Sequence, residues 1–177
     1  MAIKNLLLRS AKALIPVILL TPVLVGEGLQ RRYYEEQRNG IILRVSIPNG
    51  EICWKDFEVQ LEIKNGTGLP LKILYVNELN GFWFSVKDET GSNMPLTEEG
   101  NTFFGGGPGP LMAVSQEIGK GGHIVDKFKL CKYFILRKVG NYKVSVFWAT
   151  VNQPMVEGIG IPDIEIRDIP FTISRLK

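Results

Sequence analysis

The side chains that most often catalyse reactions or bind metals are scarce in this chain of 177 residues. His123 is the only histidine, and its place beside Gly121 and Gly122 predicts a surface residue at the start of a strand. A structural zinc site takes about four nitrogen or sulfur ligands at short spacings, which His123, Cys53 and Cys131 do not provide. No serine occupies a nucleophile elbow. The sequence therefore predicts no catalytic residue, no metal site, no cofactor and no enzymatic activity.

Two other groups of residues have only a superficial likeness to ligand sites. The run 105–110 is rich in glycine, but it lacks the Gly-Lys-Ser/Thr end of a phosphate-binding loop, and its prolines have no N–H to donate. A calcium site needs about six to eight oxygen ligands, usually in a defined loop. The sequence instead predicts a solvated sheet edge for the acidic residues Glu157, Asp163, Glu165 and Asp168.

The aromatic residues are the strongest candidates for ligand binding. Because side chains alternate along a strand, Trp83 and Phe147 point outward if the core is lined by Phe82, Phe84, Tyr142, Val144, Val146 and Trp148. An exposed aromatic pair can stack on a sugar or anchor a protein partner. Phe103 and Phe104, in a weakly patterned loop, are further candidates. Alternatively, Trp83 packs beneath a neighbouring loop or beneath the segment 29–40.

Positive charge is concentrated at the N-terminus. Three of the 21 basic residues and one of the 18 acidic residues lie within 1–28, so 18 basic and 17 acidic residues remain. Nucleic-acid binding normally needs a clustered cationic surface, and this balance does not suggest one. We therefore expect no nucleic-acid partner.

Residues 1–28 have the organisation of a secretory signal. A basic stretch precedes 13–25, which is uncharged, mostly apolar and too short for the roughly 20 residues of a membrane-spanning helix. Gly26 and Gly28 supply small residues for cleavage after Gly28. The alternative is an uncleaved membrane anchor over 6–25. In either case the domain is expected outside the cytoplasm, periplasmic or secreted, with membrane contact only if the segment stays uncleaved.

The remaining sequence predicts one all-β domain over 41–177. Phe57–Lys64 alternates strictly between apolar and polar residues, which is the pattern of a half-buried strand. The segment 29–40 is expected to be a polar linker or short helix closed by a turn at Asn39-Gly40, and 92–110 a loop. About seven or eight strands are expected, at 41–47, 57–64, 69–76, 81–88, 111–114, 123–130, 141–150 and 164–174.

Two motifs in this domain suggest a family. The first is Gly50-Glu51-Ile52 followed by an alternating strand that ends in Asn65, and the second consists of Tyr133, Gly140, Tyr142, Val144 and Val146. With these motifs, residues 41–174 resemble bacterial extracytoplasmic immunoglobulin-like or fibronectin-III-like domains. The resemblance implies an antiparallel immunoglobulin-like β-sandwich and specifies fold better than activity. One departure is Lys138-Val139, where the family usually has a proline before the glycine.

Tyr142 has a structural interpretation beside this resemblance. A tyrosine at the start of such a strand can bury its ring and donate its hydroxyl to a backbone carbonyl a few residues upstream, as in the tyrosine corner. Tyr133 is the competing candidate for this role.

The two cysteines are candidates for a disulfide. Strands of an antiparallel sandwich alternate in direction. With seven strands, leaving out the short one at 111–114, Cys53 precedes the second strand and Cys131 the sixth, so both lie at the same end. In an oxidising compartment a bond between them would close a loop of about 78 residues, worth about 4 kcal/mol on the chain-entropy model. Two separate buried thiols are the alternative.

These observations predict a non-catalytic exported module of the cell envelope with an interaction or structural role. Its partner is an unknown protein or glycan. One alternative is a carbohydrate-binding module that uses Trp83, Phe147 and the loop 98–110. Another is a protease-inhibitor-like domain that presents an exposed loop at 98–110 or 151–163.

Overall fold

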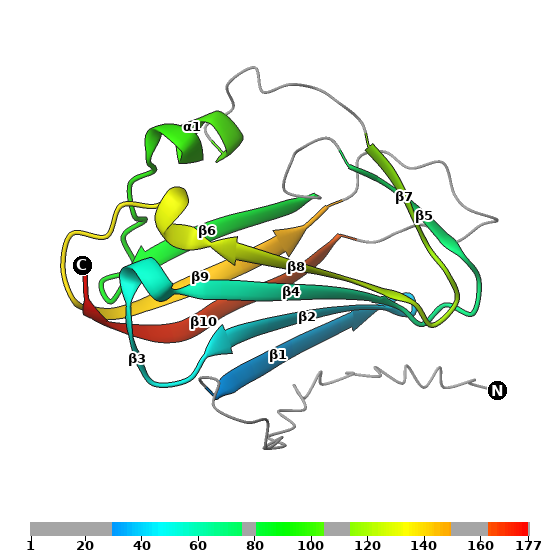
Figure 1. Cartoon of the computed structure of the whole chain (residues 1–177), viewed down its shortest axis with the longest axis horizontal. Coiled ribbons are helices and arrows are strands. Elements are labelled where there is room, and N and C mark those ends of the chain that lie inside the picture. The colour runs from blue at the N-terminus through cyan, green and yellow to red at the C-terminus, as the bar shows by residue number, and fades with distance from the viewer. Residues whose placement is uncertain (1–29, 76–80, 105–113, 150–162, 177) are drawn as a thin grey trace, which may run out of the picture.

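The computed structural model describes residues 30–75, 81–104, 114–149 and 163–176, and this part of the chain is mostly β-strand (Figure 1). Its elements are β1 (Arg31–Arg38), β2 (Ile41–Pro48), β3 (Glu51–Cys53), the 3₁₀ turn η1 (Trp54–Asp56), β4 (Glu58–Asn65), β5 (Leu71–Tyr75), β6 (Phe82–Asp88), α1 (Glu98–Phe104), β7 (Val114–Ile118), β8 (His123–Lys129), the 3₁₀ turn η2 (Leu130–Lys132), β9 (Gly140–Trp148) and β10 (Ile164–Arg175).

Eight of these strands form two packed sheets. Sheet A has the order β1-β2-β4-β8, and sheet B has the order β3-β10-β9-β6. The pairing is antiparallel except between β3 and β10. The ring of Phe57, just before β4, stacks on Phe171 of β10 with 4.2 Å between centroids, and Phe82 of β6 contacts Phe128 of β8. The predicted all-β class is therefore confirmed, and the arrangement is compatible with a β-sandwich.

Burial confirms the alternation predicted for the second strand of the domain. Phe57, Val59 and Leu61 are fully buried, and Ile63 is 2% exposed. The polar residues that alternate with them are half-buried, except Lys64, which is exposed. This register directs the apolar set into the space between the sheets, where it meets the inner side chains of sheet B.

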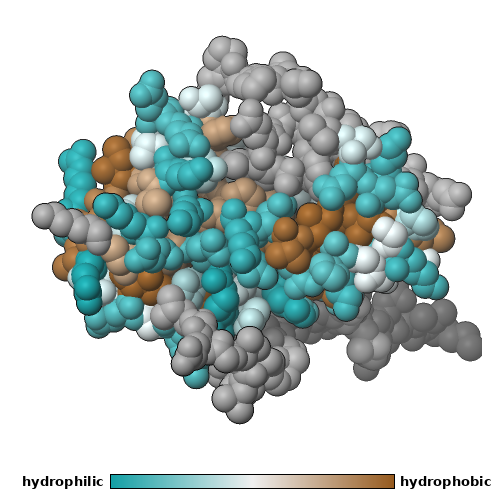
Figure 2. All heavy atoms as spheres, in the orientation of Figure 1, coloured by the Kyte–Doolittle hydropathy of each residue, from teal (hydrophilic) through white to brown (hydrophobic). Residues whose placement is uncertain are grey.

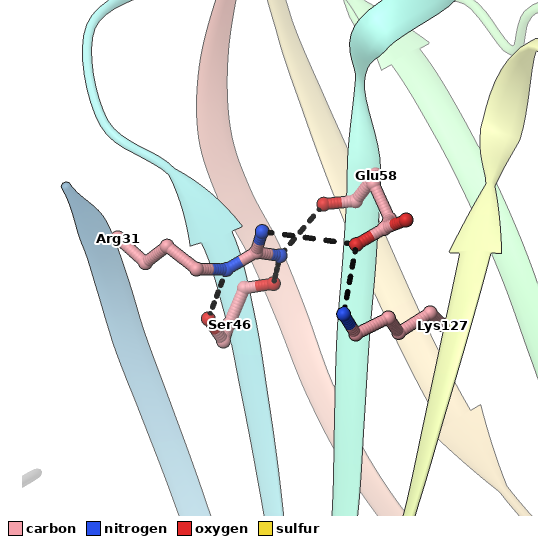
Figure 3. A network of polar contacts seen from close by, with 4 residues as sticks. All are labelled: Arg31, Ser46, Glu58 and Lys127. Carbon is pink, nitrogen blue, oxygen red and sulfur yellow. Dashed lines mark hydrogen bonds and ion pairs between the residues drawn. The ribbon is translucent and has the colours of Figure 1, made fainter. Parts of the chain in front are cut away.

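The prediction for residues 29–40 is wrong, because most of the segment forms β1 at the edge of sheet A. Asn39 and Gly40 both have positive φ, 48° and 78°, which suits the tight turn of a two-residue hairpin. Figure 3 shows how Arg31 joins β1 to its neighbours: its Nε donates to Ser46 Oγ at 2.6 Å and its Nη2 to the Glu58 carbonyl at 2.8 Å. This mostly polar strand is thus held largely by cross-strand contacts, while Tyr34 packs against the core from one face.

Two further expectations need correction. The described residues contain ten strands rather than seven or eight, and part of the loop expected at 92–110 is the helix α1. Thr97 provides its N-terminal cap, since its hydroxyl accepts a hydrogen bond of 2.9 Å from the Gly100 N–H. Gly100 is buried against the Tyr133 carbonyl, where any Cβ would collide, so α1 lies directly on the chain after η2.

Asn65 connects the end of β4 to the region where β5 and β7 pair. It is fully buried, yet its side chain makes five hydrogen bonds. The two N–H groups of the amide donate to three backbone carbonyls, those of Leu69, Ile118 and Gly119, with one N–H shared between two of them. The amide oxygen accepts from the N–H and hydroxyl of Thr67. Figure 1 shows β5 and β7 continuing beyond the ends of β4 and β8. One side chain therefore forms hydrogen bonds with both of the chain segments that connect the β4–β8 pair to the β5–β7 pair.

Replacing Asn65 with alanine should destabilise the domain by about 3 kcal/mol, since a fully buried side chain loses its hydrogen bonds to the carbonyls of Leu69, Ile118 and Gly119. Chemical denaturation followed by circular dichroism measures this loss. Asn49→Ala, at an exposed position, is the matched control and should leave stability nearly unchanged. Equal stability of the two variants would contradict the central role of Asn65.

Candidate functional site

The outer face of sheet B exposes an aromatic pair. Trp83 of β6 and Phe147 of β9 are directly opposite each other in the antiparallel ladder. Trp83 is 40% exposed and Phe147 is half-buried, whereas their neighbours on each strand are buried in the core. Both rings therefore project from the outer face, as the alternation in the sequence predicts.

The helix α1 supports this pair at the edge of sheet B. The ring of Phe104 lies 6.1 Å from that of Trp83 and 6.2 Å from that of Phe84, and it also contacts Tyr133. Phe103 packs edge-on against Tyr133 as well. The two phenylalanines proposed as ligand contacts are thus half-buried, and Phe104 positions Trp83 from the side.

A pocket of about 270 Å³ opens toward the other end of the same face. It lies where Arg32 of β1 reaches the β9–β10 ladder, and Arg32 Nη2 donates to the Pro170 carbonyl at 2.6 Å. The pocket is lined by Arg32, Glu89, Asn141, Tyr142, Lys143, Pro170, Phe171 and Thr172. No local pattern in the sequence predicts this pocket, because Arg32 and Lys143 line it together only where β1 lies against β10 in the folded chain.

Tyr142 makes the contact expected of a tyrosine corner. Its ring is buried and stacks on Phe171, and its hydroxyl donates to the Lys138 carbonyl at 2.5 Å. Burial of the hydroxyl raises the pKa of Tyr142 above its ordinary value of 10.0, and the charge of Asp88 adds to this shift. Tyr133, the competing candidate, is buried between α1 and the core.

The two cysteines are each half-buried. Cys53 immediately precedes η1, and Cys131 lies in η2 with its Sγ 3.9 Å from the Lys55 carbonyl of η1. Both therefore lie at the same end of the domain, and a disulfide between them stays a prediction.

The remaining candidates do not come together in a site. His123 is exposed at the start of β8, and Glu165 pairs with Arg167 at 2.6 Å. Glu157 and the predicted signal segment 1–28 fall outside the described residues, as do 105–110 and most of 151–163. Within the described ranges, no group of three or more potential metal ligands occurs, and no helix is long and apolar enough to cross a membrane.

Comparison with protein-family models and with curated proteins finds no match for this chain.

Tyr142→Phe should destabilise the protein by about 1 kcal/mol near neutral pH, because the Lys138 carbonyl loses its donor. The folded state raises the pKa of Tyr142, so the stabilisation is fully present below the unfolded pKa of 10.0 and is lost as the pH rises through the folded pKa. Denaturation at about pH 8 and about pH 11 should therefore show a smaller difference between the two proteins at the higher pH. A difference that stays constant would contradict the assigned shift.

Proposed function

We propose that the chain is a non-catalytic interaction module exported to the cell envelope, with an immunoglobulin-like fold. In that fold, strands B and E share one sheet, and strands C, F and G lie in the other. In this protein β4 and β8 pair in sheet A, as strands B and E would. Strands β6, β9 and β10 are neighbours in sheet B, as strands C, F and G would be. The Tyr142 contact supports this fold further.

The observation that carries the proposal is the 40% exposure of Trp83 beside Phe147 on the outer face of sheet B. Aromatic rings at such positions provide a large, rigid contact area and are typical anchors of binding sites. Phe104 holds Trp83 from one side, so little side-chain freedom would be lost on binding.

A carbohydrate ligand is the more specific form of this proposal. Two aromatic residues at opposed positions on one sheet face suit the apolar face of a sugar, which stacks on aromatic side chains. The protease-inhibitor alternative receives less support, since residues 98–104 form a helix rather than an extended loop.

Tryptophan fluorescence tests the carbohydrate form directly. The three tryptophans are Trp54, Trp83 and Trp148, and only Trp83 is appreciably exposed, at 40% against 6% and 0%. A binding polysaccharide should change the emission of the wild type but not that of Trp83→Ala. Tyr33→Ala removes an aromatic residue that is 51% exposed on β1, and this control should respond like the wild type. If no member of a polysaccharide panel changes the wild-type emission, the carbohydrate form is wrong.

Export can be tested separately on protein recovered from the native cell. N-terminal sequencing should begin at Leu29 if the signal segment is cleaved after Gly28. An intact mass without reduction should show the loss of two hydrogens if Cys53 and Cys131 are oxidised in an exported protein. A cytoplasmic protein that starts at Met1 would contradict the proposed location.

A further inference from the structure

Sheet A balances the charges on its outer face. Arg44 lies between Glu35 and Glu62 and pairs with them at 2.8 Å and 3.2 Å. Glu58 receives Arg31 from one side and Lys127 from the other, at 3.9 Å and 4.0 Å (Figure 3). Figure 2 shows hydrophilic residues interspersed with apolar ones on the molecular face that it draws. Opposite charges on neighbouring strands stabilise a sheet, so this face serves the fold.

Sheet B departs from this pattern at one place. Lys87 of β6 and Lys143 of β9 are directly opposite each other, and their inner neighbours Val86 and Val144 are buried. The two ammonium groups therefore share the outer face. Like charges at opposed positions destabilise an antiparallel pair. Among the described residues, no ion pair compensates either lysine.

The pocket described above places a third cation next to this pair. Arg32 reaches it from β1, and its Nη2 is held by the Pro170 carbonyl. Its Nε is buried and, within the described part of the chain, has no hydrogen-bond partner. A buried N–H without an acceptor costs free energy, which a ligand oxygen could recover after a small rotation of the guanidinium.

The other polar groups of the pocket set the charge that it can accept. The amide oxygen of Asn141 accepts a hydrogen bond from the Thr172 hydroxyl at 2.8 Å, so its NH₂ group remains as a donor. Glu89 is the single acidic residue among the lining residues. With Lys87 nearby, the site carries an excess of positive charge, but Glu89 disfavours a ligand with several negative charges.

We propose that this pocket binds the carboxylate of a small acid with a single negative charge. Arg32 and Lys143 would hold the carboxylate oxygens, since arginine and carboxylate match in geometry and form strong charge-assisted hydrogen bonds. A volume of about 270 Å³ lies just below the range of about 300–1,000 Å³ typical of small-molecule sites, which suits a sugar acid or an acidic amino-acid side chain. The inference goes beyond the function proposed above, because the pocket shares no residue with the aromatic pair.

The test is a titration of the ¹⁵N-labelled full chain followed by NMR, with four probes at constant ionic strength. D-Glucuronate and N-acetylglutamate α-amide carry one carboxylate each. They distinguish a sugar acid from an acidic amino-acid side chain. D-Glucose controls for the sugar ring, and inorganic phosphate controls for charge alone. At least one carboxylate should shift the amide signals of Asn141, Lys143 and Thr172, and glucose and phosphate should bind at least about tenfold more weakly.

Two lysine variants separate binding from folding. Lys143→Gln should weaken carboxylate binding by about tenfold or more while keeping or raising thermal stability, because it removes a ligand contact and a cross-strand repulsion together. Lys127→Gln is the matched control, since it removes an attractive pair on sheet A and should leave binding unchanged. The proposal is overturned if neither carboxylate shifts these signals, if glucose or phosphate binds as tightly, or if Lys143→Gln binds like the wild type. None of these outcomes depends on Trp83, so failure of this proposal is distinguishable from failure of the proposed function.

Discussion

The amide of Asn65 is the contact on which the junction between sheet A and the β5–β7 pair depends. A side chain with no solvent exposure must satisfy its polar atoms within the protein, and Asn65 does so with the two loops that follow β4 and precede β8. Its backbone extends this role, since its N–H donates to Gly122 and its carbonyl accepts from Gly121. The position of β4 against β8 is thereby fixed at one end, and β2 follows through its own pairing with β4.

A fixed register decides which side chains can meet a ligand. Because side chains alternate along a strand, a slip by one residue would turn every outward residue inward. In sheet B the register is held by the buried set on β9 and by Tyr142, whose hydroxyl ties the start of β9 to the chain before it. The exposure of Trp83 and Phe147 is therefore a consequence of core packing on the opposite face of the same strands.

The sequence predicts the apolar strands well and the polar ones poorly. The alternation of Phe57–Lys64 is a strong signal because burial of one face is the main force on that strand. In β1, Tyr33 is exposed and Tyr34 is only partly buried, so the strand depends on cross-strand pairs that appear only once its partner is known. The Asn39-Gly40 pair predicts a turn, but it indicates a hairpin only once a strand is known to lie on each side of it, as β1 and β2 do. Likewise, Arg32 and Lys143 line one pocket only because β1 reaches β10, which no local pattern reveals.

The aromatic pair and the cationic pocket lie on one face and can be related through strand geometry. Trp83 and Lys87 are four residues apart on β6 and point the same way, which separates them by about 13 Å along the strand. Their partners Phe147 and Lys143 repeat this spacing on β9. A small acid can occupy the pocket alone, whereas a ligand that contacts both ends must be extended over at least this distance. An oligosaccharide with a single terminal carboxylate has both the apolar ring faces and the one negative charge that such an arrangement of aromatic and cationic groups would bind.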